Sequence, residues 1–236
     1  MLLLPLLLGV AASRPDPWQL VLGGAALSGY LASASGQAWF RARRPPVLWA
    51  PLAVYGSTFA VLGMALVIAF PALLLALLVI GPTAIVVLGG ARPGTRRDLA
   101  NSLAQVAQAL VLVPAAAWVS GAFEVEPVVA ATAVAAGYLA GTVLVVRSVL
   151  RERGNEAFAA FSIGFHAALV GLAALVLPPV YALLAAALAL RAAGLPLLQR
   201  RLASGPRPLR PIHVGIVEIG ASVAVALVAF LAPPRG

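Results

Sequence analysis

Long apolar runs, separated by short polar segments, dominate the sequence. A helix needs about 20 mainly apolar residues to cross the hydrocarbon core of a bilayer, and most of these runs reach that length. Divided at arginine clusters and at Pro or Gly, the chain contains nine predicted spans, near 1–13, 17–40, 47–68, 71–90, 99–121, 128–150, 158–178, 180–199 and 212–232. The pattern predicts an all-α, polytopic membrane helical bundle, with a single transmembrane domain over residues 1–236.

Two of these predicted spans have weaker boundaries than the rest. The first run, "MLLLPLLLGVAAS", has the length of a signal-peptide core, but no basic residue precedes it. We therefore expect a shortened first helix. Only "IAFPA" separates the third and fourth spans. Because proline is favoured at the first position of a helix, Pro71 supports a tight turn at that point.

The arginines predict the orientation. Every even-numbered span is followed by a cluster, in chain order Arg41, Arg43 and Arg44; Arg92, Arg96 and Arg97; Arg147, Arg151 and Arg153; Arg200, Arg201, Arg207 and Arg210. The alternate connections hold only Arg14, and the C-terminal tail holds Arg235. Because basic residues in short loops stay in the cytoplasm, the N-terminus is predicted inside and the C-terminus outside.

Composition excludes several classes of protein. With 62% hydrophobic and 10% charged residues, the chain lacks the polar surface that a soluble globule needs. The net charge of +9 comes from loop arginines between apolar runs, so we expect membrane lipids, and no nucleic acid, as partners. The absence of cysteine excludes disulfides, thiolate metal sites and cysteine nucleophiles.

The charged and amide side chains inside the spans gather in the half nearer the arginine-rich ends. At about 1.5 Å per residue, Glu218 lies about 9 Å from that end, His166 about 12 Å and Arg191 about 14 Å. An ionised carboxylate within a membrane costs roughly 2.5–3.5 kcal/mol and usually has a partner or a function. We expect Glu218 to pair with Arg191 on the preceding antiparallel span, with His166 nearby. His213 is rotated about 140° away from Glu218 and is a poorer partner.

Other polar residues occupy the same half. Asn101, Gln105 and Gln108 share one helix face, while Gln37 and Arg147 lie near the membrane boundary. Together with Arg191, His166 and Glu218 they would line a cavity that is open to the cytoplasm. Such a cavity would suit an amphiphile with an anionic or hydrogen-bonding headgroup.

A structural interpretation is open for each of these residues. The ion pair would fix helix packing, His166 would make an interhelical hydrogen bond, and the amide side chains would hold helices together. Gly137 and Gly141, in "GYLAG", have the spacing of a close helix–helix contact.

The nine-span layout with an inside N-terminus resembles the UbiA-type intramembrane prenyltransferases. Those enzymes hold Mg²⁺-diphosphate with aspartate-rich motifs after their second and sixth helices. Here the matching stretches, "SGQAWFRARRPP" and "VVRSVLRERGNEAF", contain no aspartate. Because Mg²⁺ needs oxygen ligands, we expect no metal and no cofactor in this chain.

Four stretches resemble the YwiC-like family of bacterial membrane proteins: "MLLLPLLLGV", "RRDLANSLAQ", "FHAALVGLAALVLPPVYALLAAALALRAAGLPLL" and "RPIHVGIVEIGASVAVAL". The resemblance implies a multi-pass protein of the bacterial cytoplasmic (inner) membrane, with His166, Arg191, His213 and Glu218 at the shared site. The family opens with a His-Gly-Ala-Trp element just ahead of Met1, so we expect a first helix that is cut short. In some bacteria the family resembles the product of a gene next to the respiratory nitrate-reduction genes. This resemblance implies a membrane function that involves quinone, haem or nitrate.

The sequence leaves several functions open. The protein could bind a quinone or prenyl lipid, or modify such a lipid without metal, with His166 as acid or base. It could also transport a small anion, with Arg191 binding the anion and Glu218 or His166 carrying a proton, although no internal repeat typical of transporters is evident. An assembly factor without a ligand is the remaining interpretation. The sequence determines neither the ligand nor the oligomeric state.

Overall fold

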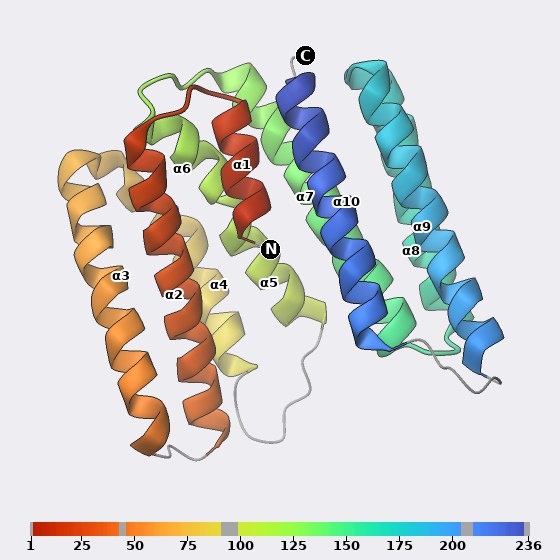
Figure 1. Ribbon diagram of the computed structural model, residues 1–236, viewed down its shortest axis with the longest axis horizontal. Coiled ribbons are helices and arrows are strands. Elements are labelled where there is room, and N and C mark those ends of the chain that lie inside the picture. The colour runs from red at the N-terminus through yellow and green to blue at the C-terminus, as the bar shows by residue number, and fades with distance from the viewer. Residues whose placement is uncertain (1, 43–45, 91–98, 204–209, 234–236) are drawn as a thin grey trace. The chain divides into compact units, whose positions relative to one another are not determined.

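The computed structural model describes residues 2–42, 46–90, 99–203 and 210–233, and these residues form helices joined by short connections (Figure 1). In chain order the helices are α1 Leu3–Ala11, α2 Pro17–Arg41, η1 Pro46–Leu48, α3 Trp49–Ala69, η2 Pro71–Ala76, α4 Leu77–Gly89, α5 Leu99–Leu110, α6 Leu112–Val119, α7 Val125–Leu150, α8 Glu156–Val176, α9 Pro179–Ala203 and α10 Pro211–Leu231. The predicted all-helical bundle is confirmed, since each of the nine predicted spans coincides with a helix or with two consecutive helices of the described chain.

Seven of the described helical segments are long and apolar enough to cross a membrane. They are Pro46–Ala69, Pro71–Gly89, Leu99–Val119, Val125–Leu150, Glu156–Val176, Pro179–Leu202 and Pro211–Leu231. With 9 residues, α1 is too short for a crossing, since it reaches only about 14 Å into a core about 30 Å thick. The longer α2 is more polar and buries Gln19, Ser28 and Gln37.

Large apolar side chains on the outside of these helices indicate contact with lipid. Leu20, Leu175 and Leu231 are between 80% and 84% exposed, in a chain where such residues would be buried if the surroundings were water. The protein is therefore a multi-pass membrane protein. Of the arginines that predict its orientation, Arg43, Arg44, Arg92, Arg96, Arg97, Arg207 and Arg235 lie outside the described residues.

The chain divides into two compact units, residues 1–132 (unit 1) and 133–236 (unit 2), with the boundary inside α7. Each unit has its own hydrophobic core, and each is described by itself. That the whole chain forms a single transmembrane domain stays a prediction.

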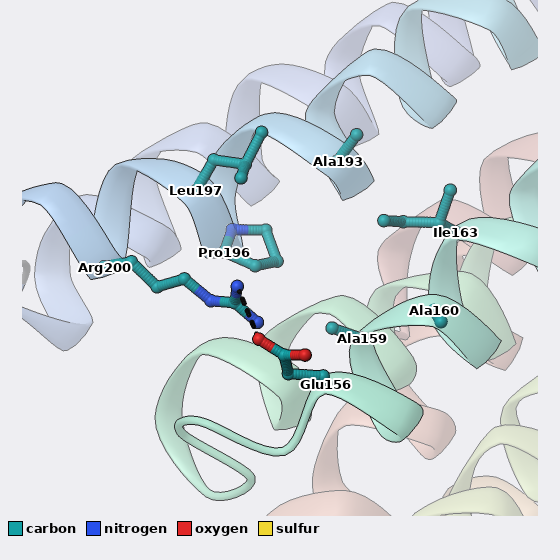
Figure 2. A pocket seen from close by; sticks show the side chains of 8 residues that line it. All are labelled: Glu156, Ala159, Ala160, Ile163, Ala193, Pro196, Leu197 and Arg200. Carbon is teal, nitrogen blue, oxygen red and sulfur yellow. Dashed lines mark ion pairs between the residues drawn. The ribbon is translucent and has the colours of Figure 1, made fainter.

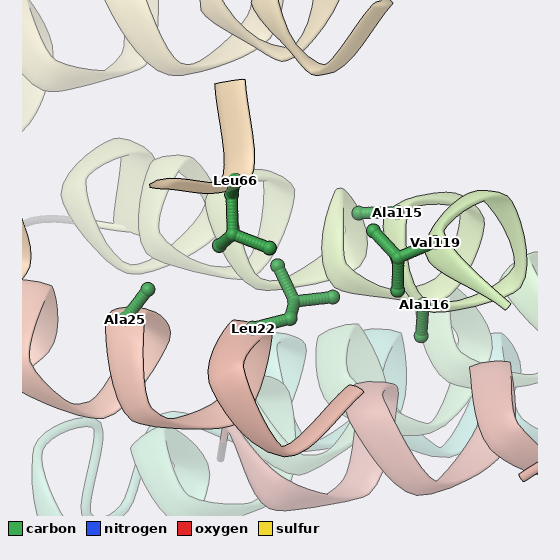
Figure 3. Packing of buried hydrophobic residues seen from close by; sticks show 6 residues of the cluster. All are labelled: Leu22, Ala25, Leu66, Ala115, Ala116 and Val119. Carbon is green, nitrogen blue, oxygen red and sulfur yellow. The ribbon is translucent and has the colours of Figure 1, made fainter. Parts of the chain in front are cut away.

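In unit 1, α2 packs along α3 and the short α1 packs against α6. The core joins α2, α3 and α6 through a cluster of small and branched side chains (Figure 3), namely Leu22, Ala25, Leu66, Ala115, Ala116 and Val119. Gly9 allows α1 to approach α6 closely, since a Cβ atom there would lie 2.6 Å from the carbonyl oxygen of Val113. The short helix α1 is thus packed against α6.

The start of α2 shows why the chain turns into a helix at residue 17. Asp16 accepts a hydrogen bond from the Trp18 N–H (2.8 Å), and the Gln19 side chain accepts one from the Asp16 N–H (3.0 Å). Pro17 then occupies the first helical position, where its missing N–H has no cost.

We expect Asp16→Ala to destabilise unit 1 by about 1 kcal/mol, because the first turn of α2 loses its cap. Asp16→Asn keeps an acceptor oxygen and should behave like the wild type. Thermal unfolding of the detergent-solubilised variants measures both changes. Equal losses in the two variants would show that the cap does not carry the effect.

In unit 2, α8 and α9 form an antiparallel pair (Figure 1). A buried cluster joins α7, α9 and α10 at the end of unit 2 where α7 terminates, and it consists of Val145, Val149, Ala192, Leu195 and Val214. Because these residues tie α7 to the last two helices, they hold in register the polar side chains that lie further along the same three helices.

Candidate functional site

Arg191 of α9 and Glu218 of α10 form the predicted ion pair inside unit 2. Arg191 Nη1 lies 2.6 Å from Glu218 Oε2, and the two side chains are only 8% and 13% exposed. Removing charges from water is costly, and mutual attraction compensates only when the geometry is good. The short contact meets that condition.

Helix α7 supplies a second layer of contacts to Glu218. The Thr142 hydroxyl donates to Glu218 Oε2 (3.0 Å), and the Tyr138 hydroxyl donates to the Glu218 carbonyl oxygen (3.1 Å). The Tyr138 and Ser222 hydroxyl oxygens lie 2.8 Å apart, so either can donate to the other in place of the Glu218 carbonyl oxygen. The guanidinium carbon of Arg191 lies 5.8 Å from the centre of the Tyr138 ring, in the range of a cation–π contact.

Sequence reasoning missed Tyr138, Thr142 and Ser222. The first two are four residues apart and share one face of α7, which was a usable signal once Glu218 was known to need partners. Ser222 is four residues after Glu218 and donates to its carbonyl oxygen (2.9 Å).

Three polar atoms of the ion pair keep unused hydrogen-bonding capacity. Among the residues that the structure describes, Arg191 Nε, Arg191 Nη2 and Glu218 Oε1 are buried and have no hydrogen-bond partner. Buried polar groups in native proteins are nearly always satisfied, and each that is not costs about 1–3 kcal/mol. The site therefore offers two donor nitrogens and one acceptor oxygen.

His166 of α8 is 2% exposed and packs against α7. Its Nδ1 donates to the Ser162 carbonyl oxygen (2.7 Å). A Cβ atom at Gly141 would lie 2.8 Å from His166 Nε2, and one at Gly137 would lie 3.1 Å from the Leu169 side chain. The close helix contact predicted from the two glycines is confirmed, and it is made with α8.

The remaining two candidates of unit 2 make their contacts at helix ends. Arg147 pairs with Glu152 in the α7–α8 connection, with Nη2 and Oε1 separated by 3.1 Å. His213 is exposed, and its Nδ1 accepts a hydrogen bond from the Arg210 N–H (3.2 Å) at the start of α10. These contacts give both residues a structural role away from the Arg191–Glu218 pair.

The amide candidates belong to unit 1. Asn101 of α5 donates to the Val87 carbonyl oxygen of α4 (3.3 Å), and Gln105 donates to the Asn101 side chain (2.9 Å). Gln37 donates to the Ser33 hydroxyl (3.3 Å), while Gln108 is half-buried on α5. The contact between Asn101 and Val87 supports the interpretation that this residue joins two helices. That these residues share a cavity with Arg191 stays a prediction.

The described residues hold no group of three or more His, Asp or Glu side chains that could bind a metal ion. The two carboxylates that follow α7 in sequence are each bound to an arginine. Glu152 pairs with Arg147, and Glu156 pairs with Arg200 at 3.1 Å.

The family model for YwiC-like protein matches residues 1–117, from α1 into α6. The matched region includes "MLLLPLLLGV" and "RRDLANSLAQ" and ends before the Arg191–Glu218 pair, so the likeness of the later stretches rests on the residues alone. No curated protein and no solved structure matches the chain. The match across the N-terminal half and the seven membrane-spanning segments lead to one conclusion: the chain belongs to the YwiC-like family and is an integral membrane protein.

Proposed function

We propose that unit 2 binds the headgroup of a membrane-soluble amphiphile, a quinone or a prenyl lipid, at Arg191 and Glu218. The observation that carries this proposal is the set of buried, unpartnered atoms Arg191 Nε, Arg191 Nη2 and Glu218 Oε1. The membrane concerned is the bacterial cytoplasmic membrane, as supported by the YwiC-like family and by the placement of the arginines.

The donors and the acceptor suit a headgroup that carries both kinds of group. Nε and Nη2 lie on one edge of the planar guanidinium of Arg191, so both can donate to the carbonyl oxygen of a headgroup, a geometry that lysine cannot offer. Glu218 Oε1 accepts from a hydroxyl. A headgroup with a carbonyl oxygen and a hydroxyl would satisfy all three atoms, and each bond to a charged group contributes about 1.5–3 kcal/mol.

Charge favours an uncharged headgroup over a small anion. Arg191 and Glu218 carry opposite charges and lie 2.6 Å apart, so the pair is neutral as a whole. Binding an anion would leave one buried negative charge without a counter-ion, which is costly in a medium of low dielectric constant. This balance supports lipid or quinone binding above the transport of a small anion.

The test uses Arg191→Lys, which keeps a cation beside Glu218 but removes Nε and Nη2. We expect lipid extracts of the detergent-purified wild type to contain an enriched quinone or prenyl lipid in mass spectra. In Arg191→Lys the enrichment should fall at least about tenfold, which is the effect of losing one charge-assisted hydrogen bond. Arg153→Lys is the matched control, because Arg153 is exposed in the connection after α7 and, among the described residues, donates only within that region, to the Val149 carbonyl oxygen (3.1 Å), and it should retain the lipid.

Two results would contradict the proposal. One is a wild-type extract with the same composition as the bulk membrane. The other is an enriched lipid that Arg191→Lys retains in full.

A further inference from the structure

A groove with a volume of about 220 Å³ lies between α8 and α9 of unit 2 (Figure 2). Its walls are apolar and come from both helices: Ala159, Ala160 and Ile163 on α8, and Ala193, Pro196 and Leu197 on α9. Glu156 and Arg200 complete the lining, and Figure 2 shows their side chains facing each other across it. The groove exists because three of the six wall residues are alanines, which leave space where larger side chains would fill the interface.

The polar end of this groove lies at the first turn of α8 and the last turns of α9. Glu156 and Arg200 pair at 3.1 Å, but their side chains are 81% and 44% exposed. An exposed ion pair of this kind contributes little to stability, so a phosphate can displace Glu156 from Arg200 at small cost.

The groove begins at the first residue of α8 and extends along the helix toward the middle of the predicted span. Glu156 begins its span, and Ile163 is seven residues further along α8, so the groove extends about 10 Å inward at the rise of a helix. A cation at one end of the groove, followed by apolar walls, matches the order of the phosphate and the acyl chain in a phospholipid.

The charge at this end of unit 2 favours an anionic lipid. The described chain ends of α7, α8, α9 and α10 carry an excess of arginine over glutamate here, with Arg147, Arg151, Arg153, Arg200, Arg201 and Arg210 against Glu152 and Glu156. Basic residues near a membrane surface attract anionic headgroups.

We propose that the groove between α8 and α9 binds an anionic phospholipid, with one acyl chain along Ala160, Ile163 and Ala193 and the phosphate on Arg200. This lipid site shares no residue with the Arg191–Glu218 pair. It is independent of the function proposed above, because it rests on a different cavity and on a different ion pair.

Native mass spectrometry of the delipidated protein in a neutral detergent tests the site. Phosphatidylglycerol and phosphatidylcholine with identical acyl chains are added separately. We expect phosphatidylglycerol to bind about fivefold more tightly, and Arg200→Gln to remove that preference, which is the effect of one arginine at a membrane surface. Arg200→Lys should restore it. Glu156→Gln should strengthen binding of phosphatidylglycerol, since Arg200 loses its competing partner.

A separate variant tests whether the acyl chain lies in the groove. Ala193→Phe fills the groove and should weaken binding of both lipids, whereas Leu175→Phe, at an 84% exposed position of α8 outside the groove, should not. Equal binding of the two lipids, unchanged in Arg200→Gln, would overturn the proposal and indicate general lipid contact. Unchanged binding of both lipids in Ala193→Phe would also overturn it, because the acyl chain would then lie elsewhere.

Discussion

Replacing Arg191 with methionine is expected to destabilise the protein by about 3–5 kcal/mol, because Glu218 would keep a buried charge without a cation beside it. The native pair is short, at 2.6 Å, and both side chains are nearly buried. Of the residues that the structure describes, Thr142 would remain as a hydrogen-bond donor to Glu218 Oε2. Titration with a denaturing detergent, followed by circular dichroism, measures the change.

Two further variants separate the ion pair from the size of the side chain. Arg191→Met combined with Glu218→Leu removes both charges, and its stability should return to within about 1–2 kcal/mol of the wild type. Arg200→Met breaks the exposed pair with Glu156 and should cost less than about 1 kcal/mol. If Arg191→Met were as mild as Arg200→Met, or if the double variant were as unstable as the single one, the charge of Glu218 would not be the cause of the loss of stability.

Gly141→Leu is expected to have the next largest effect, a loss of about 3 kcal/mol, because it forces a side chain into a filled helix interface. A Cβ atom at this position would meet His166 Nε2 at 2.8 Å and His166 Cε1 at 3.1 Å. The ring has little room to move, since it is buried and Ser162 holds its Nδ1. The same detergent titration measures the loss.

The matched control is Gly164→Leu on α8. Within the described part of the chain nothing lies within 4 Å of a Cβ atom at that glycine, so the substitution should be neutral or should stabilise the helix by up to about 1 kcal/mol. Adding His166→Ala to Gly141→Leu should recover part of the loss by opening space. A Gly141→Leu variant with wild-type stability would show that α7 and α8 are not in close contact there.

Hydropathy predicted most of the helices to within a few residues. The spans expected near 17–40 and 212–232 are α2, Pro17–Arg41, and α10, Pro211–Leu231. A membrane helix satisfies its backbone hydrogen bonds internally, so the residues at which it begins and ends depend mainly on the local amino-acid composition. The interruption at Val111 between α5 and α6 is a local effect as well, because Pro114 has no N–H to donate to the Leu110 carbonyl oxygen.

The pairing of Arg191 with Glu218 was predictable for a different reason. Ionised side chains within the predicted spans are few, and each needs a counter-ion. Few basic residues were therefore available as the partner of Glu218. Tyr138, Thr142 and Ser222 were not predictable in this way. Hydroxyl side chains can bond to carbonyl oxygens of their own helix, as Ser222 does, so their presence in a span demands no partner from another helix.

The sequence by itself determined the class of the protein, the helices and the identity of the buried ion pair, because hydrophobic length and the cost of charge in lipid act locally. The tertiary structure alone decided which face of α7 meets Glu218, that His166 packs on Gly141, and that a groove opens between α8 and α9. These features depend on how each helix is rotated about its axis. Side chains from distant parts of the chain set that rotation through close packing, so it cannot be predicted from the sequence of one helix.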